Sequence, residues 1–527
     1  MVKKGKQAII DSRFLQMCDI PEQSLSLEPF TMVIFGGAGD LSKRKLLPSL
    51  LHLYREKELA EFEVIAFDML AIAEQEYLAM MKDAVTTYAT EVFEEEAWRE
   101  FATHLHFISG HFEEDENYRG LAELLNQVTR PTPKATRIAI YYMAVPPHVA
   151  PLVIDKLKNH DLCKGRYNAR IVMEKPFGTN RASAADLNRV LTDAFDEPQI
   201  YRIDHYLARD PVQNIIFFRF SNTLFEEIWD HRLVDNVQIT VAEKIGIEHR
   251  GAFYEQAGVV RDIVQNHILQ ILGLVAMEPP IGFDAESIRD EKLKIMRSVR
   301  PIDGPYVDKF MVRGQYGRGR VDRSSVAGYR EEPDVSPSST TSTYFAGKFY
   351  IDNLRWAGVP FFVRTGKRMP TQVTEVCVEL KRLPLRLFGR TCDSLDPNIL
   401  ILTVQPDERI TLRFGVKYPY SNNQIFSANM VFNYGETFKV PPHSPYERLL
   451  IDLIKGDLTL FVREDTIEAM WAVVDPIISR WEEEPPESFP NYAAGTWGPP
   501  EARHLIEREG RNWITGAEQR APTRSSG

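Results

Sequence analysis

Between residues 31 and about 200, short apolar runs alternate with helical patterns, and this alternation limits the possible folds more than any other feature of the chain. The first run, Met32 to Phe35, leads into a glycine turn and then into apolar residues at helical spacing. Later runs repeat this texture, namely FEVIAFDML, LHFISGHF, RIAIYYMAVPP and ARIVMEKPF. Strands that alternate regularly with helices predict an α/β fold with a parallel, doubly wound sheet.

The turn after the first strand predicts a nucleotide site. Gly36 and Gly39 make the turn tight, and a helix begins at Asp40, so that free backbone N–H groups and the positive end of the helix dipole would face a phosphate. We expect Leu41 and Ser42 to complete this Rossmann-like loop. The spacing is GxxGxxS rather than GxGxxG, so a purely structural turn stays open as an alternative. No Gly-Lys-Ser/Thr follows, which argues against a P-loop.

After about residue 210 the pattern of predicted strands and helices changes. Strand patterns from DNVQITVAEKIG to FSANMVFNY follow one another with little helix between them, which predicts an α+β domain with a large antiparallel sheet. A helical segment from Arg261 to Met277 interrupts this series, and 322–343 is rich in Ser, Thr and Pro, as loops are. A chain of 527 residues is too long to form a single domain around one hydrophobic core. We therefore expect a lead-in tail, a dinucleotide-binding domain, an α+β domain and an irregular C-terminal tail over 1–28, 29–205, 206–484 and 485–527.

Charge and cysteine content exclude several classes of protein. The formal net charge is -11 and the pI is about 5.7, which argues against nucleic acid as a partner and requires an anionic substrate to be met by locally gathered cations. Cys18, Cys163, Cys377 and Cys392 have no metal-ligand spacing and are expected to be reduced. No segment approaches the roughly 20 apolar residues that cross a bilayer, and no signal peptide is evident. We expect a cytoplasmic protein with no membrane partner.

Three segments place ionisable side chains among apolar ones: RDIVQNHILQ at 261–270, YRIDHYLARD at 201–210 and IVMEKPFGTN at 171–180. We expect their ionisable residues to converge on one pocket. His267 is the candidate for removing a proton from a substrate hydroxyl. Asp204 is the candidate carboxylate that fixes the imidazole tautomer. The alternative for His267 is a buried histidine whose nitrogens bond the backbone.

Other residues offer binding groups. His205 and Tyr206 carry donors suited to a phosphate, although they would also suit a polar strand end. Lys175 precedes Pro176, and a cis prolyl bond there would aim the lysine into the cleft; alternatively it is an ordinary cation at a strand end. Lys367 follows a strand in a glycine-containing turn, where a solvated loop charge is the alternative.

Taken in their order along the chain, these residues resemble glucose-6-phosphate dehydrogenase, and the resemblance extends from about residue 31 to about residue 480. The segments that carry the resemblance are GGAGDLSKRKLLPSL, EKPFG, RIDHYL, VQNI, RDIVQNHILQ, RWAGVPFFVRTGK, VQP and YERLLIDLIKGD. RIDHYL together with RDIVQNH is highly specific, whereas EKP occurs in other sugar dehydrogenases. The resemblance implies oxidation of glucose 6-phosphate to 6-phosphoglucono-1,5-lactone with NADP or NAD, as the first step of the oxidative pentose phosphate pathway. It also implies a homodimer or homotetramer whose large sheet forms the dimer interface.

By resemblance, His267 is the general base and Asp204 is its partner, and no metal is required. Lys175 would orient both the sugar and the nicotinamide. The residues implied to bind glucose 6-phosphate are Lys175, His205, Tyr206, Glu243, Asp262 and Lys367, with His205 and Tyr206 on the phosphate.

Two departures from the family pattern concern the substrate. Arg209 stands where the family usually has a phosphate-binding lysine; it keeps the charge and can bind phosphate through two donors, with a different reach. Gln372 stands where a second cation commonly follows the RTGK lysine, which removes one charge near the substrate.

A third departure concerns the cofactor. The second strand ends in VIAFDML, and Asp68 falls where an acidic side chain binds the adenosine ribose in NAD enzymes and would repel a 2′-phosphate. Met69 occupies the position where NADP users generally have an arginine. We therefore expect good use of NAD, with Lys43, Arg44 and Lys45 offsetting part of the repulsion. The alternative is that Asp68 caps the next helix.

Two further functions stay open at this point. A regulator that keeps the fold without turnover is disfavoured by the joint presence of His267, Asp204 and Lys175. A nucleic-acid-binding or scaffold role would have only the loop at 322–343 and the C-terminal tail as partner sites.

Overall fold

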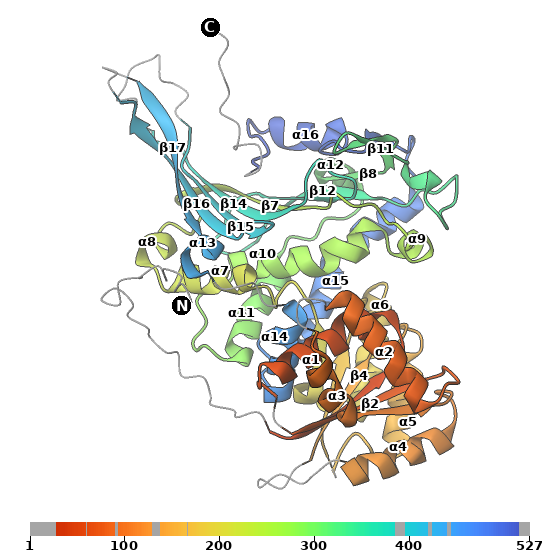
Figure 1. Cartoon of the computed structure of the whole chain (residues 1–527). Helices are drawn as coiled ribbons and strands as arrows, with labels where there is room; N and C mark the ends of the chain where they lie inside the picture. Colours follow the sequence, from red (N-terminus) through yellow and green to blue (C-terminus); the bar gives the residue numbers. More distant parts are fainter. Residues whose placement is uncertain are drawn as a thin grey trace, which may run out of the picture.

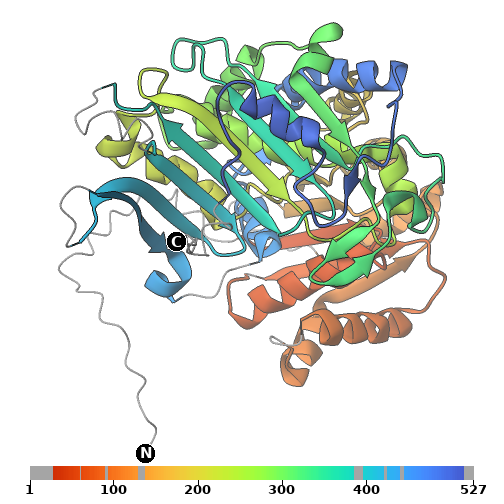
Figure 2. The ribbon, with the colours of Figure 1, turned by 90° about the horizontal axis from the view of Figure 1, so that it is seen from above.

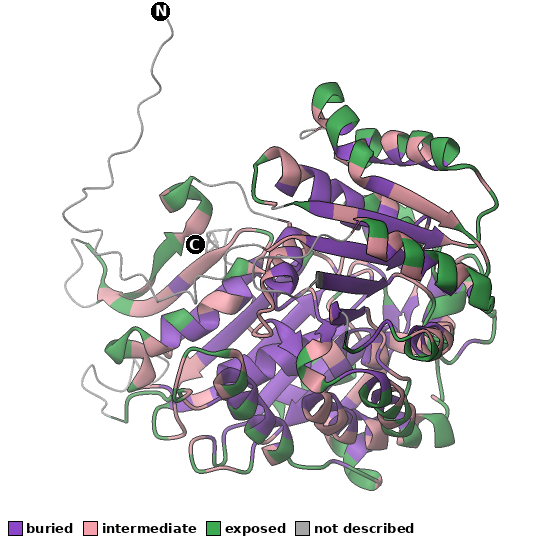
Figure 3. Ribbon diagram, turned by 90° about the horizontal axis from the view of Figure 1, so that it is seen from below, coloured by how far each residue is buried: buried purple, intermediate pink, exposed green. Residues whose placement is uncertain are grey.

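Two β-sheets, each with helices packed against it, organise the chain (Figure 1). The structure is a computed structural model, and it describes residues 28–59, 61–89, 93–128, 137–165, 167–384, 396–419, 424–439 and 444–515. The predicted lead-in tail lies almost entirely outside the described residues, as does the end of the C-terminal tail. Figure 3 shows that buried residues concentrate in the strands and in the helix faces that cover them, while the outer helices are largely exposed.

The first sheet has seven strands in the order β18-β6-β5-β4-β1-β2-β3. Their bounds are β1 Phe30–Phe35, β2 Phe62–Asp68, β3 Leu105–Ser109, β4 Arg137–Met143, β5 Tyr167–Met173, β6 Ile200–Ile203 and β18 Phe461–Val462. All pairs are parallel except β18 with β6. The predicted parallel, doubly wound sheet is therefore confirmed. Strand β1, between β4 and β2, is buried along its whole length, which explains its predominantly apolar sequence.

Helices connect these parallel strands. They are α1 Leu47–Arg55, α2 Glu74–Tyr88, α3 Glu95–Phe101, α4 Asp115–Val128, α5 Ala150–Asn159 and α6 Arg181–Ala194. Helix α1 follows a π-helical turn, Ser42–Leu46, and buries Leu47, Leu50 and Leu51. The helical spacing of these leucines fixes which face of α1 meets the sheet.

The second sheet has eight strands in the order β17-β16-β15-β14-β7-β13-β12-β8. Their bounds are β7 Val234–Ala242, β8 Met311–Gly314, β12 Tyr344–Phe349, β13 Phe361–Gly366, β14 Val373–Leu380, β15 Ile399–Gln405, β16 Arg409–Lys417 and β17 Ile425–Asn433. Only the β7–β13 pair is parallel among these strands. The prediction of a large, mainly antiparallel sheet is confirmed.

Helices lie on both faces of this second sheet. In the view of Figure 1, α7 (Asp210–Phe220) and α10 (Leu269–Ala276) run beneath it, on the side of the first sheet. Every residue of α10 is buried, which matches its apolar sequence LQILGLVA. Helix α16 (Pro500–Glu507) lies on the opposite face, and Figure 2 shows it above the strands.

The prediction of an irregular C-terminal tail from residue 485 is wrong for the described residues. A short strand β19 (Tyr492–Ala493) and α16 follow, and Leu505 and Ile506 of α16 are buried. The Pro-rich and Gly-rich composition misled the prediction, because proline at the first helical turn starts α16 rather than breaking it. The loop predicted at 322–343 also contains a hairpin strand, β11 (Ser324–Val326), that pairs with β10 (Gly319–Val321).

Two smaller observations concern the other predictions. Cys163 and Cys377 are free thiols in the interior; Cys18 and Cys392 lie outside the described residues. Within the described ranges, no helix combines the length and the apolar character that a membrane span requires.

Candidate active site

The carboxyl ends of neighbouring parallel strands bring the first site residues together. Lys175 follows β5 and Asp204 follows β6, and these strands pair in parallel with Met173 opposite Arg202. Parallel strands end at the same edge of a sheet, so the two side chains emerge side by side. The Lys175–Pro176 peptide bond is cis.

A π-helical segment supplies the partner of both residues. Helix α9 (Gly251–Val259) bends at Gly258, where φ is 58°, and continues as the π-helix Val260–Ile268, which runs directly into α10. Asp262 and His267 lie on this segment and are buried. π-Helical turns are rare in general and frequent at functional sites, because they reset the direction of side chains along a helix.

His267 is held between a carboxylate and an ammonium. Its Nδ1 lies 2.6 Å from Asp204 Oδ1, and its Nε2 lies 3.0 Å from Lys175 Nζ. Because the carboxylate can only accept, Nδ1 carries the proton and Nε2 keeps its lone pair. Tyr206 stacks on the imidazole with ring centroids 4.0 Å apart, and the His205 ring meets its edge at 4.6 Å.

The electrostatics keep this histidine neutral. Burial lowers the pKa of His267 below its ordinary value, although the charge of Asp204 opposes that shift. Burial by itself would raise the pKa of Asp204, but the interaction with His267 holds it below its usual range. At neutral pH the arrangement is therefore a carboxylate that fixes the tautomer of a neutral imidazole.

Lys367 and Glu243 meet through the single parallel pair of the second sheet. Ala242 at the end of β7 pairs with Gly366 at the end of β13, so the next residues on the two strands emerge together. Lys367 Nζ lies 2.5 Å from Glu243 Oε2 and 3.6 Å from Asp262 Oδ2.

Asp262 joins the two halves of the cluster, since Lys175 Nζ also lies 3.4 Å from its Oδ1. Burial opposes ionisation of Asp262, but Lys175 and Lys367 together lower its pKa to about 2. Asp262 is therefore an anion shared by two lysines.

Arg209 also contacts Tyr206. Its guanidinium carbon is 5.1 Å from the centre of the Tyr206 ring, and one of its terminal nitrogens donates to Gln405 Oε1 at 2.9 Å. The Gln405 amide in turn donates to Thr374 Oγ1. The sequence interpretation used VQP only as part of a resemblance and missed Gln405 as a contact of Arg209; strand pairing of Thr374 with Gln405 was not visible in the sequence.

Gln372, which stands where a second cation is common in the family, has no contact with this cluster among the hydrogen bonds and ion pairs of the described residues. Gln372 is exposed, between β13 and β14. All of the other predicted catalytic and substrate-binding residues join one continuous set of contacts: Lys175, Asp204, His205, Tyr206, Arg209, Glu243, Asp262, His267 and Lys367.

The predicted nucleotide loop lies at the same edge of the first sheet. Gly36 has φ of 82°, and a Cβ there would lie 2.4 Å from the carbonyl oxygen of Ala144. A Cβ on Gly37, which the sequence interpretation did not single out, would lie 2.5 Å from the Ala66 Cβ. The buried Ser42 hydroxyl points back to the Gly36 carbonyl at 3.4 Å, and Asp40 is exposed and paired with Arg44. Leu41 precedes the π-helical turn as its N-cap. Gly36 and Gly37 leave no room for a side chain at the glycine turn.

Asp68 contacts this turn from the end of β2. Its Oδ2 accepts from the Ala38 N–H at 2.9 Å, and its Oδ1 accepts from the Leu70 N–H at 3.1 Å. It does not cap the next helix: the N-cap of α2 is Ala73, whose N–H donates to Glu76. The capping alternative for Asp68 is therefore wrong. Met69 is half exposed.

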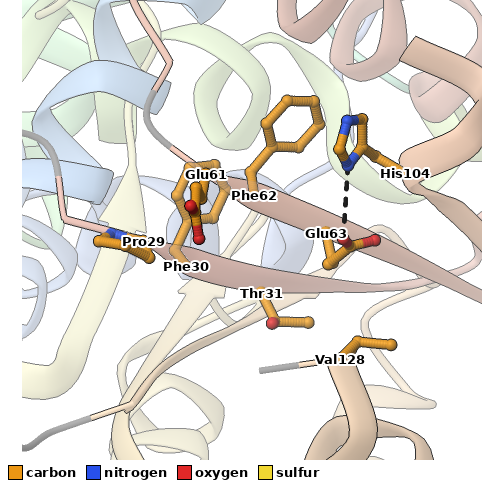
Figure 4. Close-up of a pocket in the computed structure, with 8 residues that line it drawn as sticks. All are labelled: Pro29, Phe30, Thr31, Glu61, Phe62, Glu63, His104 and Val128. Carbon is orange, nitrogen blue, oxygen red and sulfur yellow. Dashed lines mark hydrogen bonds and ion pairs between the residues drawn. The ribbon is translucent and has the colours of Figure 1, made fainter. Parts of the chain in front are cut away.

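A separate hollow lies at the opposite edge of the first sheet. Figure 4 shows its lining, which includes Phe30 and Phe62 at the amino ends of β1 and β2 and the contact between His104 and Glu63. Because strands β1 and β2 run from this edge to the glycine turn, the hollow is distant from the His267 cluster and takes no part in it.

Asp204, His205 and His267 offer three ligand atoms within 4.8 Å of one another. Two of these atoms, Asp204 Oδ1 and His267 Nδ1, are hydrogen-bonded to each other. Their arrangement is that of a base and its orienting carboxylate.

Comparisons with known proteins match two consecutive parts of the chain. Residues 33–214 match the model of the glucose-6-phosphate dehydrogenase NAD binding domain, and residues 216–514 match that of the glucose-6-phosphate dehydrogenase C-terminal domain. The glucose-6-phosphate 1-dehydrogenase of Chlamydia pneumoniae is 39% identical over 494 residues, which cover 92% of this chain and 96% of that protein.

Two solved structures are similar along nearly their whole length. One is a glucose-6-phosphate dehydrogenase in complex with its substrate glucose-6-phosphate, with a TM-score of 0.83 and 31% identity over 92% of this chain and 98% of that one. The other is the glucose-6-phosphate 1-dehydrogenase of Mycobacterium avium, with a TM-score of 0.79 and 34% identity over 92% of this chain and 99% of that one.

Proposed function

Because this chain belongs to the glucose-6-phosphate dehydrogenase family, we propose that His267 is the base that removes the proton from O1 of glucose 6-phosphate. The chain is an oxidoreductase that converts D-glucose 6-phosphate to 6-phospho-D-glucono-1,5-lactone, the first step of the oxidative pentose phosphate pathway. A nicotinamide dinucleotide, when bound, supplies the acceptor for the hydride that leaves C1.

The observation that most supports this role is that His267 Nε2 is unprotonated and already accepts a hydrogen bond, from Lys175. Asp204 fixes the other ring nitrogen as the donor, so Nε2 can accept the O1 proton as the C1–O1 bond becomes a carbonyl. Asp204 then stabilises the imidazolium that forms. Tyr206, stacked on the ring, keeps its plane fixed.

Lys175 is proposed to orient the substrate hydroxyl. Its ammonium donates to His267 Nε2 and also to the Asp262 carbonyl oxygen at 3.1 Å. Binding of the sugar would exchange the Nε2 contact for O1, which leaves the lysine beside the oxygen that loses its proton. Lys175 also follows β5 at the edge where the nicotinamide would lie, so one cation can position both reactants.

The charges divide the substrate site into a sugar end and a phosphate end. Lys367 is neutralised by Glu243 and Asp262, a set suited to sugar hydroxyls. Arg209 bonds the neutral amide of Gln405 and so keeps its charge for an anion. We place the phosphate at Arg209, with His205 and Tyr206 as further donors.

The glycine turn fits a dinucleotide. Gly36, Gly39, Asp40, Leu41 and Ser42 would hold its diphosphate, because side chains larger than hydrogen cannot occupy the tight turn and the helix begins behind it. The reaction needs no metal in this scheme, since the proton and the hydride both have acceptors.

The preference between NAD and NADP depends on Asp68. Its carboxylate lies at the carboxyl end of β2 against the Ala38 N–H, where a ribose 2′-phosphate would approach a negative charge. Of the nearby cations, Arg44 is paired with Asp40 and lies over the Tyr88 ring. We propose that NAD is used at least as well as NADP.

Assembly, domain limits and compartment are part of the same proposal. The edge strand β17 and its neighbourhood expose large apolar side chains, among them Phe426 at 56%, Met430 at 62% and Val431 at 54%. An exposed apolar patch of this kind is typical of a subunit interface, so we propose a homodimer or a homotetramer of such dimers. We further propose a cytoplasmic enzyme with a dinucleotide domain at 29–205 and a substrate and dimerisation domain at 206–484.

Replacing the base should separate binding from turnover. His267→Asn keeps a polar side chain but cannot take the proton, so kcat should fall roughly 100-fold or more. The stabilisation of the protein against heat by glucose 6-phosphate should be preserved. Asp204→Asn should lower kcat less, because it only disturbs the tautomer. Turnover of His267→Asn near the wild-type rate would remove His267 from this role.

The pH dependence of kcat/KM should report the lowered pKa of His267. Only the neutral imidazole accepts a proton, so activity is complete above its pKa and is lost as pH falls through it. The midpoint of the loss should therefore lie below pH 6.5, the ordinary value for histidine. The substrate phosphate also titrates at about pH 6. The fall in kcat/KM at low pH that is absent in His267→Asn is therefore the part of the profile assigned to the base. An identical profile in both proteins would contradict the assignment.

Arg209→Ala should raise KM for glucose 6-phosphate far more than KM for the nicotinamide cofactor. It removes a charge-assisted contact to a group remote from the reacting carbon. Arg209→Lys, which keeps the charge, is the matched control and should retain most of the affinity. Initial rates with glucose and glucose 6-phosphate test the substrate itself: equal efficiency for both sugars would refute the phosphate site.

The cofactor preference is tested by kcat/KM for NAD and NADP. A like charge a few Å from a 2′-phosphate costs on the order of several kcal/mol before screening, enough for a hundredfold change in preference. Asp68→Ala with Met69→Arg should move the preference towards NADP. Asp68→Asn is the control that keeps an acceptor for the Ala38 N–H while removing the charge. A wild-type preference for NADP that Asp68→Asn leaves unchanged would show that Asp68 acts only on the turn.

A further inference from the structure

The turn that carries Lys367 is anchored on both sides by backbone hydrogen bonds. The Lys367 N–H donates to the Thr343 carbonyl at 3.0 Å, and the Arg368 N–H donates to the Ile245 carbonyl at 3.1 Å. The Met369 N–H donates to the Glu243 carbonyl at 2.9 Å. These bonds tie the turn to the ends of β7 and β12, but they leave the carbonyl oxygens of Lys367 and Arg368 to other partners.

A segment from near the C-terminus supplies those partners. The Tyr492 hydroxyl donates to the Lys367 carbonyl at 2.9 Å, and the Gly495 N–H donates to the Arg368 carbonyl at 2.7 Å. The two donors come from residues 125 positions or more beyond the turn in the chain. The turn therefore depends on a segment that has no contact with the His267 imidazole among the described hydrogen bonds.

Tyr492 is itself oriented by a buried chain of hydrogen bonds. The Tyr316 N–H donates to Thr343 Oγ1 at 3.0 Å, and Thr343 Oγ1 lies 3.1 Å from the Tyr492 hydroxyl. Because the Tyr492 proton is committed to Lys367, the Thr343 hydroxyl must donate to Tyr492. Successive bonds of this kind polarise one another in a buried setting.

The turn needs these anchors for two reasons. Arg368 has φ of 52°, a left-handed conformation that a non-glycine residue adopts at a cost. The Lys367 side chain is also only 1% exposed, and its ammonium lies 5.4 Å from the centre of the Tyr254 ring as well as beside Glu243 and Asp262. A small shift of the backbone would therefore move an ammonium that has little room to readjust.

We propose that Tyr492 is a positioning residue for Lys367, so that the C-terminal segment sets the affinity for the sugar. This rests on the proposed function of Lys367 as a substrate ligand. It assigns to Tyr492 an effect on substrate binding that is separate from its contribution to packing, because the hydrogen bond to the Lys367 carbonyl comes from its hydroxyl and the packing from its ring.

Tyr492→Phe removes that hydroxyl and keeps the ring. It leaves the Lys367 carbonyl buried without a donor, which typically changes an equilibrium by about tenfold or more. KM for glucose 6-phosphate should therefore rise about tenfold. KM for the nicotinamide cofactor and kcat should stay within about twofold of the wild type, because the His267 dyad is untouched.

Tyr344→Phe is the matched control. Tyr344 belongs to the same buried cluster, its ring lies 5.5 Å from that of Tyr492, and its buried hydroxyl has no hydrogen-bond partner among the described residues. Its loss should leave KM for glucose 6-phosphate unchanged. Thr343→Val, which breaks the chain one step earlier, should raise that KM in the same direction as Tyr492→Phe and by a smaller factor.

The outcomes distinguish the possibilities. A wild-type protein that does not oxidise glucose 6-phosphate would refute the proposed function itself. An active wild type whose KM for glucose 6-phosphate is the same in Tyr492→Phe would overturn the positioning role alone. Equal increases in Tyr492→Phe and Tyr344→Phe, accompanied by equal losses of thermal stability, would also overturn it, because they would reflect general loosening of the cluster.

Discussion

The buried hydrogen bond between Asp204 and His267 is the interaction on which the site depends. Asp204 comes from the end of a strand in the first sheet and His267 from the π-helical segment that leads under the second sheet. Burying either group alone would cost free energy, because an unpaired carboxylate or imidazole in the interior loses its hydrogen bonds to water and gains none in the protein. Their 2.6 Å contact therefore joins the end of β6 to the π-helical segment and fixes the tautomer of the proposed base.

The other charges of the site follow from strand ends. Parallel pairing of β5 with β6 and of β7 with β13 brings Lys175 beside Asp204 and Lys367 beside Glu243. Asp262 lies between the two lysines and lets both remain charged in a buried place. A chain with net charge -11 can thus present cations to an anionic substrate only where topology concentrates them.

The sequence predicted what depends on local pattern. The alternation of strand and helix patterns predicted the first sheet, and the closely spaced strand patterns predicted the second. Both predictions succeed because the spacing of apolar residues follows which side of each element is buried. Gln405 and Tyr492 were missed as contacts, since each acts through a partner more than 100 residues away. Asp68 was placed correctly at the end of β2, but its bond to Ala38 depends on how the glycine turn folds back. The C-terminal helix was missed because proline can start a helix as well as end one.

The residues proposed to bind the sugar and those proposed to take its proton are held by different parts of the molecule. His267 and Asp204 are held by the interface between the sheets, whereas Lys367 is held from the outer side of the second sheet by the segment at Tyr492. Loosening of that outer layer would displace Lys367, the proposed sugar ligand, through the backbone of one turn and would leave the proposed base His267 and its tautomer in place. Local stability near the C-terminus is therefore expected to govern the affinity for glucose 6-phosphate more than the rate of hydride transfer.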